Sequence, residues 1–255
     1  MASLRAVLLD LDGVLYIGDG ILPGAAEAIR RLRRARIPLC FVTNTSRKPR
    51  RVILERLSVM GLDVRDAELL TPARAAVAWL EAHRCGAHFL IHDDIREDFS
   101  GVGTGLDAAV VIGDAADGFT YDALNECFRR IMNGAPFLAL ARNRYFMESD
   151  GINLDMGAYV VGLEYATGRT AVTIGKPSRT FFETAIGIVG CTANETAMIG
   201  DDVDADVNGA IATGLRAILV RTGKYRSADD ERVAAGGYVA DNVGAAVDFV
   251  LGMHK

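Results

Sequence analysis

Two aspartates two residues apart end the first apolar run of this chain, and they restrict its fold more than any other feature. The run from Ala6 to Leu9 is typical of a buried strand, and it continues through Asp10 and Asp12 into a turn at Gly13. Open α/β sheets carry their chemistry where strands end. Side chains alternate along a strand, so both carboxylates would share one face if the strand continued. The feature predicts an α/β fold with a reactive first strand end.

A cation is expected beside this pair of aspartates. Two carboxylates held close together resist joint ionisation unless a positive charge joins them. Hard carboxylate oxygens suit magnesium, so the pair predicts a Mg²⁺ site. An isolated D-x-D pair can equally be solvated and cap the loop that follows it, and three further motifs bear on this choice.

Strand-like and helical runs alternate along almost the whole chain, which predicts β-α-β units. Residues 142–155 are polar and aromatic with one glycine, and we expect them to form a functional loop. The predicted strands are 7–11, 38–42, 87–92, 108–112, 136–141, 197–200, 217–220 and 238–240, and the predicted helices are 24–35, 49–60, 71–82, 121–132, 156–167, 178–189, 206–213 and 242–251.

Composition excludes several classes of function. A net charge of −5 argues against a general surface for nucleic acid or anionic membranes, because both need a positive field. The longest apolar runs are strand-sized, so no transmembrane helix is expected. The first residues hold no basic-then-apolar leader, which predicts a cytoplasmic protein. The four histidines and four cysteines show no zinc-like spacing.

Two further motifs follow strand ends. Thr43 and Asn44 come after the second predicted strand, where a hydroxyl and free backbone N–H groups can hold phosphoryl oxygens. A simple helix N-cap is the alternative at that position. Lys176 stands between Gly175 and Pro177, where a fixed ammonium can neutralise phosphate charge. An exposed turn lysine is the alternative there.

The fourth motif is a cluster of acids after the predicted strand 197–200. So many carboxylates in one short turn repel each other unless a cation or ordered water organises them. A purely structural role is therefore disfavoured. The acids are Asp201, Asp202, Asp204 and Asp206.

The order and spacing of these four motifs resemble the haloacid dehalogenase (HAD) superfamily, over essentially the whole chain. The large insertion between Asn44 and Lys176 resembles the subfamily with a type-two α/β cap, which includes the NagD-type phosphatases. The resemblance implies a Rossmann-like core with a parallel sheet, formed by residues 1–78 and 173–255, and an inserted α/β cap formed by residues 79–172.

Three stretches outside the motifs resemble one branch of that subfamily. The branch holds the phospholysine phosphohistidine inorganic pyrophosphate phosphatases and the HAD-like hydrolase domain-containing proteins. The stretches are Leu90 to Asp94, Leu163 to Thr167 and Arg221 to Tyr225.

The resemblance implies a role for each core motif. Asp10 would be the nucleophile that forms an aspartyl-phosphate. Asp12 would protonate the leaving oxygen and later deprotonate water. Thr43 and Asn44 would bind phosphoryl oxygens, and Lys176 would balance charge near substrate and nucleophile.

A magnesium ion completes the implied site. Asp10, the backbone carbonyl of Asp12 and Asp201 would hold it, while Asp206 and Asp202 would order its water molecules. Dehalogenation needs no magnesium, and its enzymes lack the second aspartate, so Asp12 argues against that reaction.

Specificity is expected in the cap loop. Many NagD-type members carry Asn-Pro-Asp there, whereas this chain has Asn143 followed by Arg144, Tyr145 and Phe146. Arg142 or Arg144 would bind an anionic tail, with Asn143 beside them, and an aromatic ring would stack on the substrate. A solvated loop is the alternative for each residue.

The sequence thus predicts a Mg²⁺-dependent phosphatase for small phosphorylated compounds, with phosphomonoesters, phosphoramidates and pyrophosphate all open. A phosphotransferase that uses the same intermediate, and a catalytically silent binding or regulatory HAD protein, remain alternatives. No nucleic acid or membrane partner is expected, and a homodimer is left open.

Overall fold

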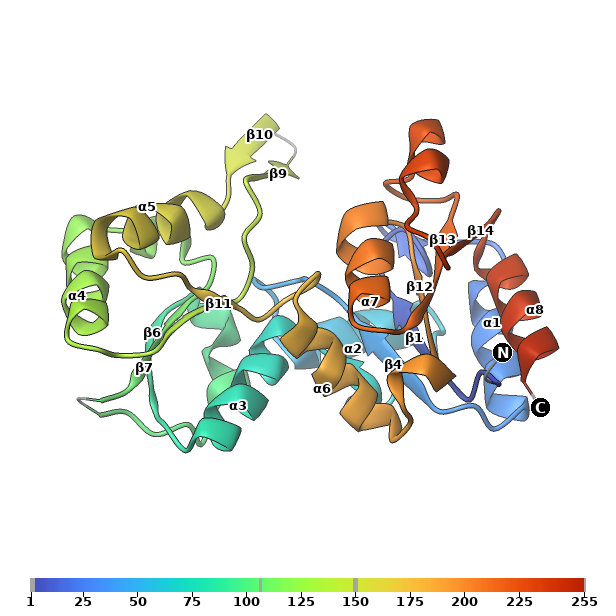
Figure 1. The fold of residues 1–255 in the computed structure, drawn as a ribbon, viewed down its shortest axis with the longest axis horizontal. Coiled ribbons are helices and arrows are strands. Elements are labelled where there is room, and N and C mark those ends of the chain that lie inside the picture. Colours follow the sequence, from blue (N-terminus) through green and yellow to red (C-terminus); the bar gives the residue numbers. More distant parts are fainter. Residues whose placement is uncertain (1–2, 106, 149–150, 255) are drawn as a thin grey trace. The chain divides into compact units, whose positions relative to one another are not determined.

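The computed structural model describes residues 3–105, 107–148 and 151–254. The chain divides into two compact units (Figure 1). The core unit comprises Met1–Thr43, Arg51–Leu70 and Lys176–Lys255, and the inserted unit comprises Asn44–Arg50 and Thr71–Gly175. The two units divide the chain at other positions than the predicted 78/79 and 172/173, and the helix Pro72–His83 belongs entirely to the inserted unit. The predicted domain bounds stay a prediction.

A six-stranded parallel sheet forms the middle of the core unit. Its order is β14-β13-β12-β1-β4-β5, so β1 lies between β12 and β4. Every residue of β1 is buried, because helices cover both faces of the sheet. The strands are β1 (Ala6–Asp10), β4 (Leu39–Val42), β5 (Leu69–Leu70), β12 (Thr196–Gly200), β13 (Arg216–Val220) and β14 (Tyr238–Ala240).

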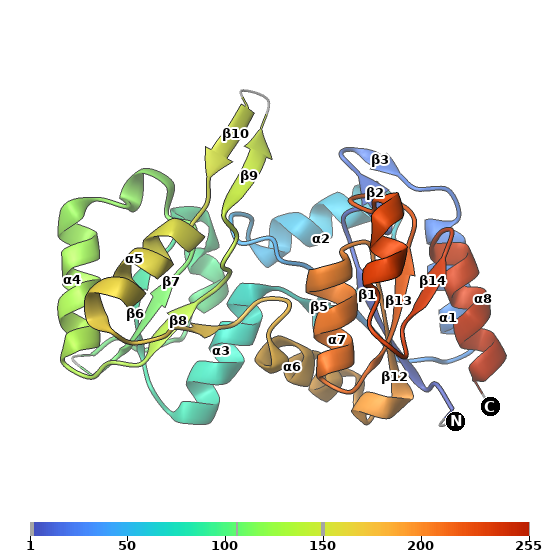
Figure 2. The same cartoon turned by 45° about the horizontal axis from the view of Figure 1, so that its top comes forward.

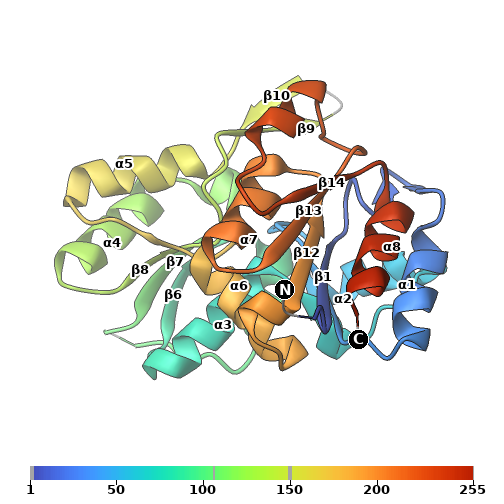
Figure 3. The ribbon, with the colours of Figure 1, turned by 45° about the vertical axis from the view of Figure 1, so that its right-hand side comes forward.

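Helices α1 and α8 lie on one face of this sheet, and α6 and α7 lie on the other (Figure 1). Helix α1 buries Ala25, Ala28, Ile29 and Leu32, whose spacing places them on one helical face. Helices α1 and α8 lie side by side (Figure 3), and near α8 the Leu4 amide donates to the carbonyl of Met253. The helices are α1 (Ala25–Arg34), α2 (Arg50–Val59), α6 (Arg179–Val189), α7 (Gly209–Ala212) and α8 (Val243–Met253).

A short hairpin of β2 (Tyr16–Ile17) and β3 (Gly20–Ile21) follows the first strand. A hairpin of two-residue strands has little stability by itself, and contacts from one arginine stabilise this one. The Arg56 guanidinium donates to the Gly18 carbonyl, lies 3.1 Å from the Asp19 carboxylate and sits over the Tyr16 ring at 4.9 Å. The sequence analysis did not predict this hairpin.

The inserted unit holds its own parallel sheet in the order β11-β8-β7-β6. Its strands are β6 (Ala87–Leu90), β7 (Ala109–Ile112), β8 (Phe137–Ala139) and β11 (Val172–Thr173), and its helices are α3 (Pro72–His83), α4 (Tyr121–Met132) and α5 (Gly157–Thr167). Thr71 caps α3, the helix predicted at 71–82, by accepting a hydrogen bond from the amide of Arg74 at 3.2 Å.

Two predicted segments differ from the structure. Residues 142–155 were predicted to be a loop, but they contain an antiparallel hairpin of β9 (Tyr145–Glu148) and β10 (Gly151–Leu154), which stands apart from the four-stranded sheet (Figure 2). The helix predicted at 206–213 begins earlier, as a π-helix η5 (Val203–Asn208) that continues into α7. The cause is Asp202, whose side chain accepts from the amides of Asp204 and Ala205 at 3.1 and 2.9 Å.

Five short 3₁₀ segments connect the described elements, and no helix in the described ranges is both long enough and apolar enough to cross a bilayer. The 3₁₀ segments are η1 (Asp66–Glu68), η2 (Asp93–Phe99), η3 (Ala116–Gly118), η4 (Ala193–Glu195) and η6 (Ser227–Arg232).

Candidate active site

The candidate site lies where the central strands of the core unit end. Asp10 is the last residue of β1, Asp201 directly follows β12, and Thr43 directly follows β4. Because these strands are parallel neighbours, their carboxyl ends lie at one edge of the sheet. The structure therefore brings three of the predicted positions to one edge.

Lys176 joins two buried carboxylates at this edge. Its Nζ lies 2.7 Å from Oδ1 of Asp10 and 2.6 Å from Oδ1 of Asp206, and its side chain is only 4% exposed. The alternative of an exposed turn lysine is therefore wrong. Asp206, which the sequence placed only among the groups that order water, is a direct partner of the lysine.

Three carboxylates share this small volume with the lysine. Asp10, Asp201 and Asp206 each offer an oxygen, and these oxygens all lie within 4.8 Å of one another. Burial is the largest cause that raises the pKa of Asp10, while the nearby Lys176 opposes the rise. Burial raises the pKa of Asp201 to about 6 and that of Asp206 to about 7. Such shifts are typical of a functional site.

The lysine remains charged despite its burial. Burial by itself lowers the pKa of Lys176, but the carboxylates of Asp10 and Asp206 outweigh it, and the net shift is upward. Lys176 thus contacts two of the three acids, while the Lys224 charge acts on Asp201 from a greater distance. A bound metal cation would favour ionisation of all three acids together.

Asp201 has one oxygen occupied and one open. Its Oδ2 accepts a hydrogen bond from the backbone amide of Lys224 at 2.7 Å. Its Oδ1 is buried and has no hydrogen-bond partner among the residues that the structure describes. An orphaned buried carboxylate oxygen is costly unless a ligand satisfies it, and a hard cation suits it. This group of residues therefore fits a magnesium ion.

Asp202 and Gly200 shape the turn around this cluster. The Asp202 amide donates to Oδ2 of Asp206 at 3.2 Å, which orients the Asp206 side chain. A Cβ atom on Gly200 would lie 2.3 Å from Asp206, so glycine is required for the carboxylate to approach. The sequence analysis did not single out Gly200.

Asp12 lies in a different environment from Asp10. The chain leaves the strand after Asp10, and Asp12 forms an isolated bridge with Tyr16 at the start of the hairpin. Asp12 is exposed whereas Asp10 is buried. The prediction that a continued strand would place Asp10 and Asp12 on one face is therefore wrong. The cluster of three carboxylates contains Asp206 and not Asp12.

Thr43 and Asn44 belong to different units. Thr43 is buried in the core unit, and its amide donates to the Leu70 carbonyl at 3.2 Å. Asn44 begins the inserted unit, where a Cβ atom on Gly175 would lie 2.9 Å from its Oδ1.

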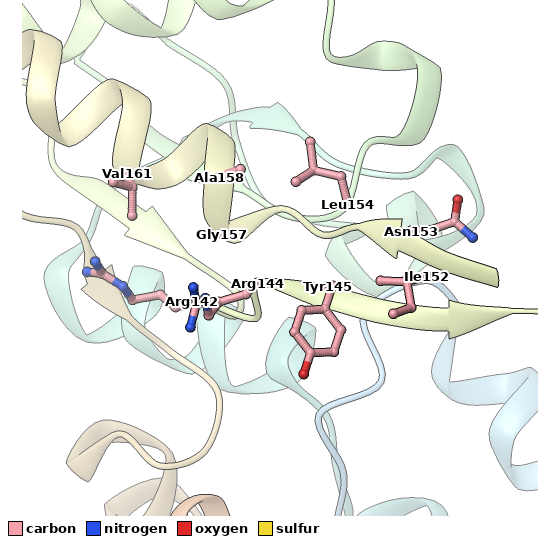
Figure 4. A pocket seen from close by; sticks show the side chains of 9 residues that line it. All are labelled: Arg142, Arg144, Tyr145, Ile152, Asn153, Leu154, Gly157, Ala158 and Val161. Atoms are coloured by element: carbon pink, nitrogen blue, oxygen red, sulfur yellow. The ribbon is translucent and has the colours of Figure 1, made fainter.

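Two of the three predicted cap residues, Arg142 and Arg144, line a pocket of about 540 Å³ in the inserted unit (Figure 4). Arg142 is held by Glu164 through two hydrogen bonds of 2.8 and 2.9 Å. Arg144 is exposed and has no acidic partner in the described parts of the chain. Asn143 does not line the pocket but donates a side-chain hydrogen bond to the buried Asp155.

The opposite side of this pocket is apolar. Ala158 and Val161 of α5 lie across from the arginines in Figure 4, and Val161 is 50% exposed. The pairing of Leu154 with Tyr145 places both on one face of the β9–β10 hairpin, together with Ile152. All three are exposed.

The other face of the hairpin packs within the inserted unit. Phe146 lies on that face, with the Arg47 guanidinium 4.4 Å from its ring centroid. Arg47 in turn contacts the buried Asp114, with Nε 2.5 Å from Oδ2. Phe146 is therefore engaged by this arginine, while Tyr145 remains exposed.

Comparison with known proteins agrees with this arrangement. A family model for haloacid dehalogenase-like hydrolases matches residues 7–105, and a HAD-hydrolase-like model matches residues 173–246. Haloacid dehalogenase-like hydrolase domain-containing protein 2 of Bos taurus is 42% identical over 98% of this chain and 96% of its own. The chain belongs to the haloacid dehalogenase-like hydrolases. The phospholysine phosphohistidine inorganic pyrophosphate phosphatase of Bos taurus is 41% identical, over 98% of this chain and 96% of its own.

Solved structures of this family share the fold. A 4-nitrophenylphosphatase of Thermotoga maritima superposes with a TM-score of 0.86 and 26% identity, covering 97% of each chain. NagD of E. coli gives a TM-score of 0.83 and 25% identity, covering 95% of this chain and 98% of its own. The predicted fold class, family, NagD-like relationship and branch are confirmed. The predicted enzyme class, a HAD-type phosphatase, is confirmed by the family match and by the phosphatases among these relatives.

Proposed function

We propose that this protein is a Mg²⁺-dependent phosphatase of small phosphorylated compounds that works through an aspartyl-phosphate on Asp10. One observation carries the proposal: a buried Lys176 contacts Asp10 at 2.7 Å, beside Asp201 with its open oxygen. Phosphoryl transfer needs positioning and charge neutralisation above all, and this set of residues supplies both.

The reaction is proposed to proceed in two steps. A carboxylate oxygen of Asp10 attacks phosphorus, the bond to the leaving oxygen breaks, and Asp12 donates a proton to that oxygen. Asp12 then takes a proton from water, which attacks phosphorus and releases Asp10 and inorganic phosphate. Thr43, Asn44 and Lys176 hold the phosphoryl oxygens and balance their charge.

Asp10, the Asp12 carbonyl and Asp201 are the proposed magnesium ligands, with Asp202 and Asp206 ordering the ion's water molecules. When bound, magnesium would neutralise charge that develops on the phosphoryl oxygens. The open Oδ1 of Asp201 and the raised pKa values of the cluster support this assignment.

The pocket of the inserted unit supports a substrate class. Arg144 adds positive charge beside the side chains of Tyr145, Ile152 and Leu154, whereas the charge of Arg142 is balanced by Glu164, which holds its guanidinium at the edge of the pocket. We propose that the leaving group has an apolar or aromatic body and a second anionic group, with Asn143 bracing the loop through Asp155. Phosphomonoesters are the preferred class, because a retained proton donor at Asp12 serves a leaving oxygen of high pKa.

A panel of substrates tests the proposal. Phosphate release is measured from 4-nitrophenyl phosphate, an alkyl phosphate, a phosphoramidate and pyrophosphate, each with Mg²⁺ and with EDTA. Magnesium-dependent release from the esters is the expected result. Transfer to an added alcohol in place of water would indicate a phosphotransferase, and no release from any compound would favour a binding or regulatory protein. A homodimer and a cytoplasmic location stay predictions of the sequence.

A further inference from the structure

We propose that the turn Thr222–Lys224, directly after β13, is a positioning element for the proposed magnesium site, with the Thr222 hydroxyl as its key group. The turn fixes Asp201 so that one carboxylate oxygen is satisfied and the other stays open, and it restrains the Asp12–Gly13 segment. This inference rests on the proposed function, because it gives the turn a purpose only if the cluster binds a cation.

The turn first determines which oxygen of Asp201 is open. The Lys224 amide occupies Oδ2 at 2.7 Å, and the carboxylate is only 1% exposed, so water cannot replace this donor freely. Oδ1 is left with no hydrogen-bond partner in the described part of the chain. Groups that orient a metal-binding carboxylate in this way commonly matter almost as much as the ligand itself.

Two glycines allow this close approach. A Cβ atom on Gly223 would lie 2.1 Å from Oδ2 of Asp201 and 2.4 Å from the Cα atom of Gly13. A Cβ atom on Gly13 would lie 1.9 Å from the same oxygen. Both glycines also have positive φ angles, 80° for Gly13 and 62° for Gly223. Asp201 is therefore held between two backbone segments that admit no side chain.

Thr222 ties these two segments together. Its hydroxyl donates to the carbonyl oxygen of Gly13 at 2.5 Å, across 209 positions of sequence. The carbonyl belongs to the residue after Asp12, whose own carbonyl is a proposed ligand. Loss of this bond would release the turn from the nucleophile loop and loosen Asp201 and the Asp12 carbonyl together.

The Lys224 side chain has a separate role from its backbone. Its Nζ lies 3.5 Å from Oδ2 of Asp202, and the side chain is 69% exposed. The hydrogen bond to Asp201 comes from the backbone amide. For this reason Thr222 is the better position for a side-chain test.

The test measures Mg²⁺ binding by calorimetry, without substrate, for the unaltered protein and for Thr222→Val, Thr222→Ser and Thr196→Val. Thr196 is the matched control: it is buried and its hydroxyl donates to the Thr192 carbonyl at 2.9 Å, at the opposite end of β12 from Asp201. Thr222→Val should weaken Mg²⁺ binding by about 10- to 100-fold. Thr222→Ser should restore it, and Thr196→Val should leave it unchanged even if it lowers the melting temperature.

Turnover measured against Mg²⁺ concentration adds a second criterion. Thr222→Val should need more Mg²⁺ for half-maximal rate and recover much of kcat when the ion saturates. Unchanged Mg²⁺ affinity in Thr222→Val, or an equal loss in Thr196→Val, would overturn this inference alone. An unaltered protein that binds no Mg²⁺ would overturn the proposed metal site and this inference with it.

Discussion

Replacing Lys176 by methionine should destabilise the metal-free protein in a pH-dependent way. Methionine keeps most of the side-chain volume but removes the charge that contacts Asp10 at 2.7 Å and Asp206 at 2.6 Å. Removing one partner of a buried ion pair costs about 3–5 kcal/mol, because the remaining charge is left unpaired. This cost applies at pH 8, where the carboxyl groups of the unfolded chain are ionised.

At pH 5.5 the same replacement should cost less. The pKa of Asp206 is about 7 even beside the lysine, chiefly through burial, and it rises further when the cation is removed. At pH 5.5 Asp206 is then protonated in the unaltered protein as well, so this proton adds nothing to the difference between the two proteins, and the loss is mainly that of hydrogen bonds, about 1–2 kcal/mol. Above pH 7 the unaltered protein ionises Asp206 while the variant keeps this proton, which costs the variant about 1.4 kcal/mol per pH unit, so the destabilisation should grow by about 1–2 kcal/mol from pH 5.5 to pH 8.

Urea unfolding in EDTA at both pH values measures these quantities. Lys48→Met is the control, since Lys48 is exposed and should give no pH-dependent difference. The charge of Lys176 itself does not change in this window, because its pKa is raised. A Lys176→Met destabilisation that is equal at the two pH values, or greater at pH 5.5, would refute the reasoning about the buried cluster.

Four further predictions concern the ion, the hairpin with Asp12, and the pocket. The rise in melting temperature caused by Mg²⁺ should be larger at pH 8 than at pH 5.5. Burial raises the pKa values of Asp201 to about 6 and of Asp206 to about 7, and protons compete with the ion at pH values below these pKa values. A larger rise at pH 5.5 would contradict this. Arg56→Ala should release the β2–β3 hairpin next to Asp12 and slow the hydrolysis of alkyl phosphates more than that of 4-nitrophenyl phosphate, whose leaving group needs no proton. Asp12→Asn should show the same selectivity, with turnover of alkyl esters reduced by about 10²- to 10⁴-fold. Arg144→Ala should raise KM for substrates with a second anionic group while leaving KM for 4-nitrophenyl phosphate unchanged, and an equal effect on both would count against the proposed pocket.

The arrangement of the core strand ends could be predicted from sequence. Asp10, Thr43 and Asp201 each follow an apolar run, and parallel strands deliver their carboxyl ends to one edge whatever the details of packing. The cap at Thr71 likewise depends on a local hydrogen bond, which is present. Such features can be recognised from residues that are neighbours in the sequence.

Features set by contacts distant in sequence could not be predicted. The approach of Gly13 and Gly223 to Asp201 joins three separate strand ends, and nothing local marks those glycines as close neighbours. The direct pairing of Lys176 with Asp206 was missed for the same reason. The sequence predicted a loop at the β9–β10 hairpin because residues 142–155 mix polar and aromatic types around a glycine. Tyr145 and Leu154 of the hairpin are exposed, so no buried apolar face produces a strand-like pattern there.

Trapping of the phosphorylated enzyme tests the central claim most directly. The protein is mixed with 4-nitrophenyl phosphate and Mg²⁺, quenched in acid within a single turnover, and digested for mass spectrometry. A phosphoryl group on the peptide that carries Asp10, together with loss of both label and turnover in Asp10→Asn, is the predicted result. Turnover that persists in Asp10→Asn, or a phosphoryl group found on another residue, would contradict the account.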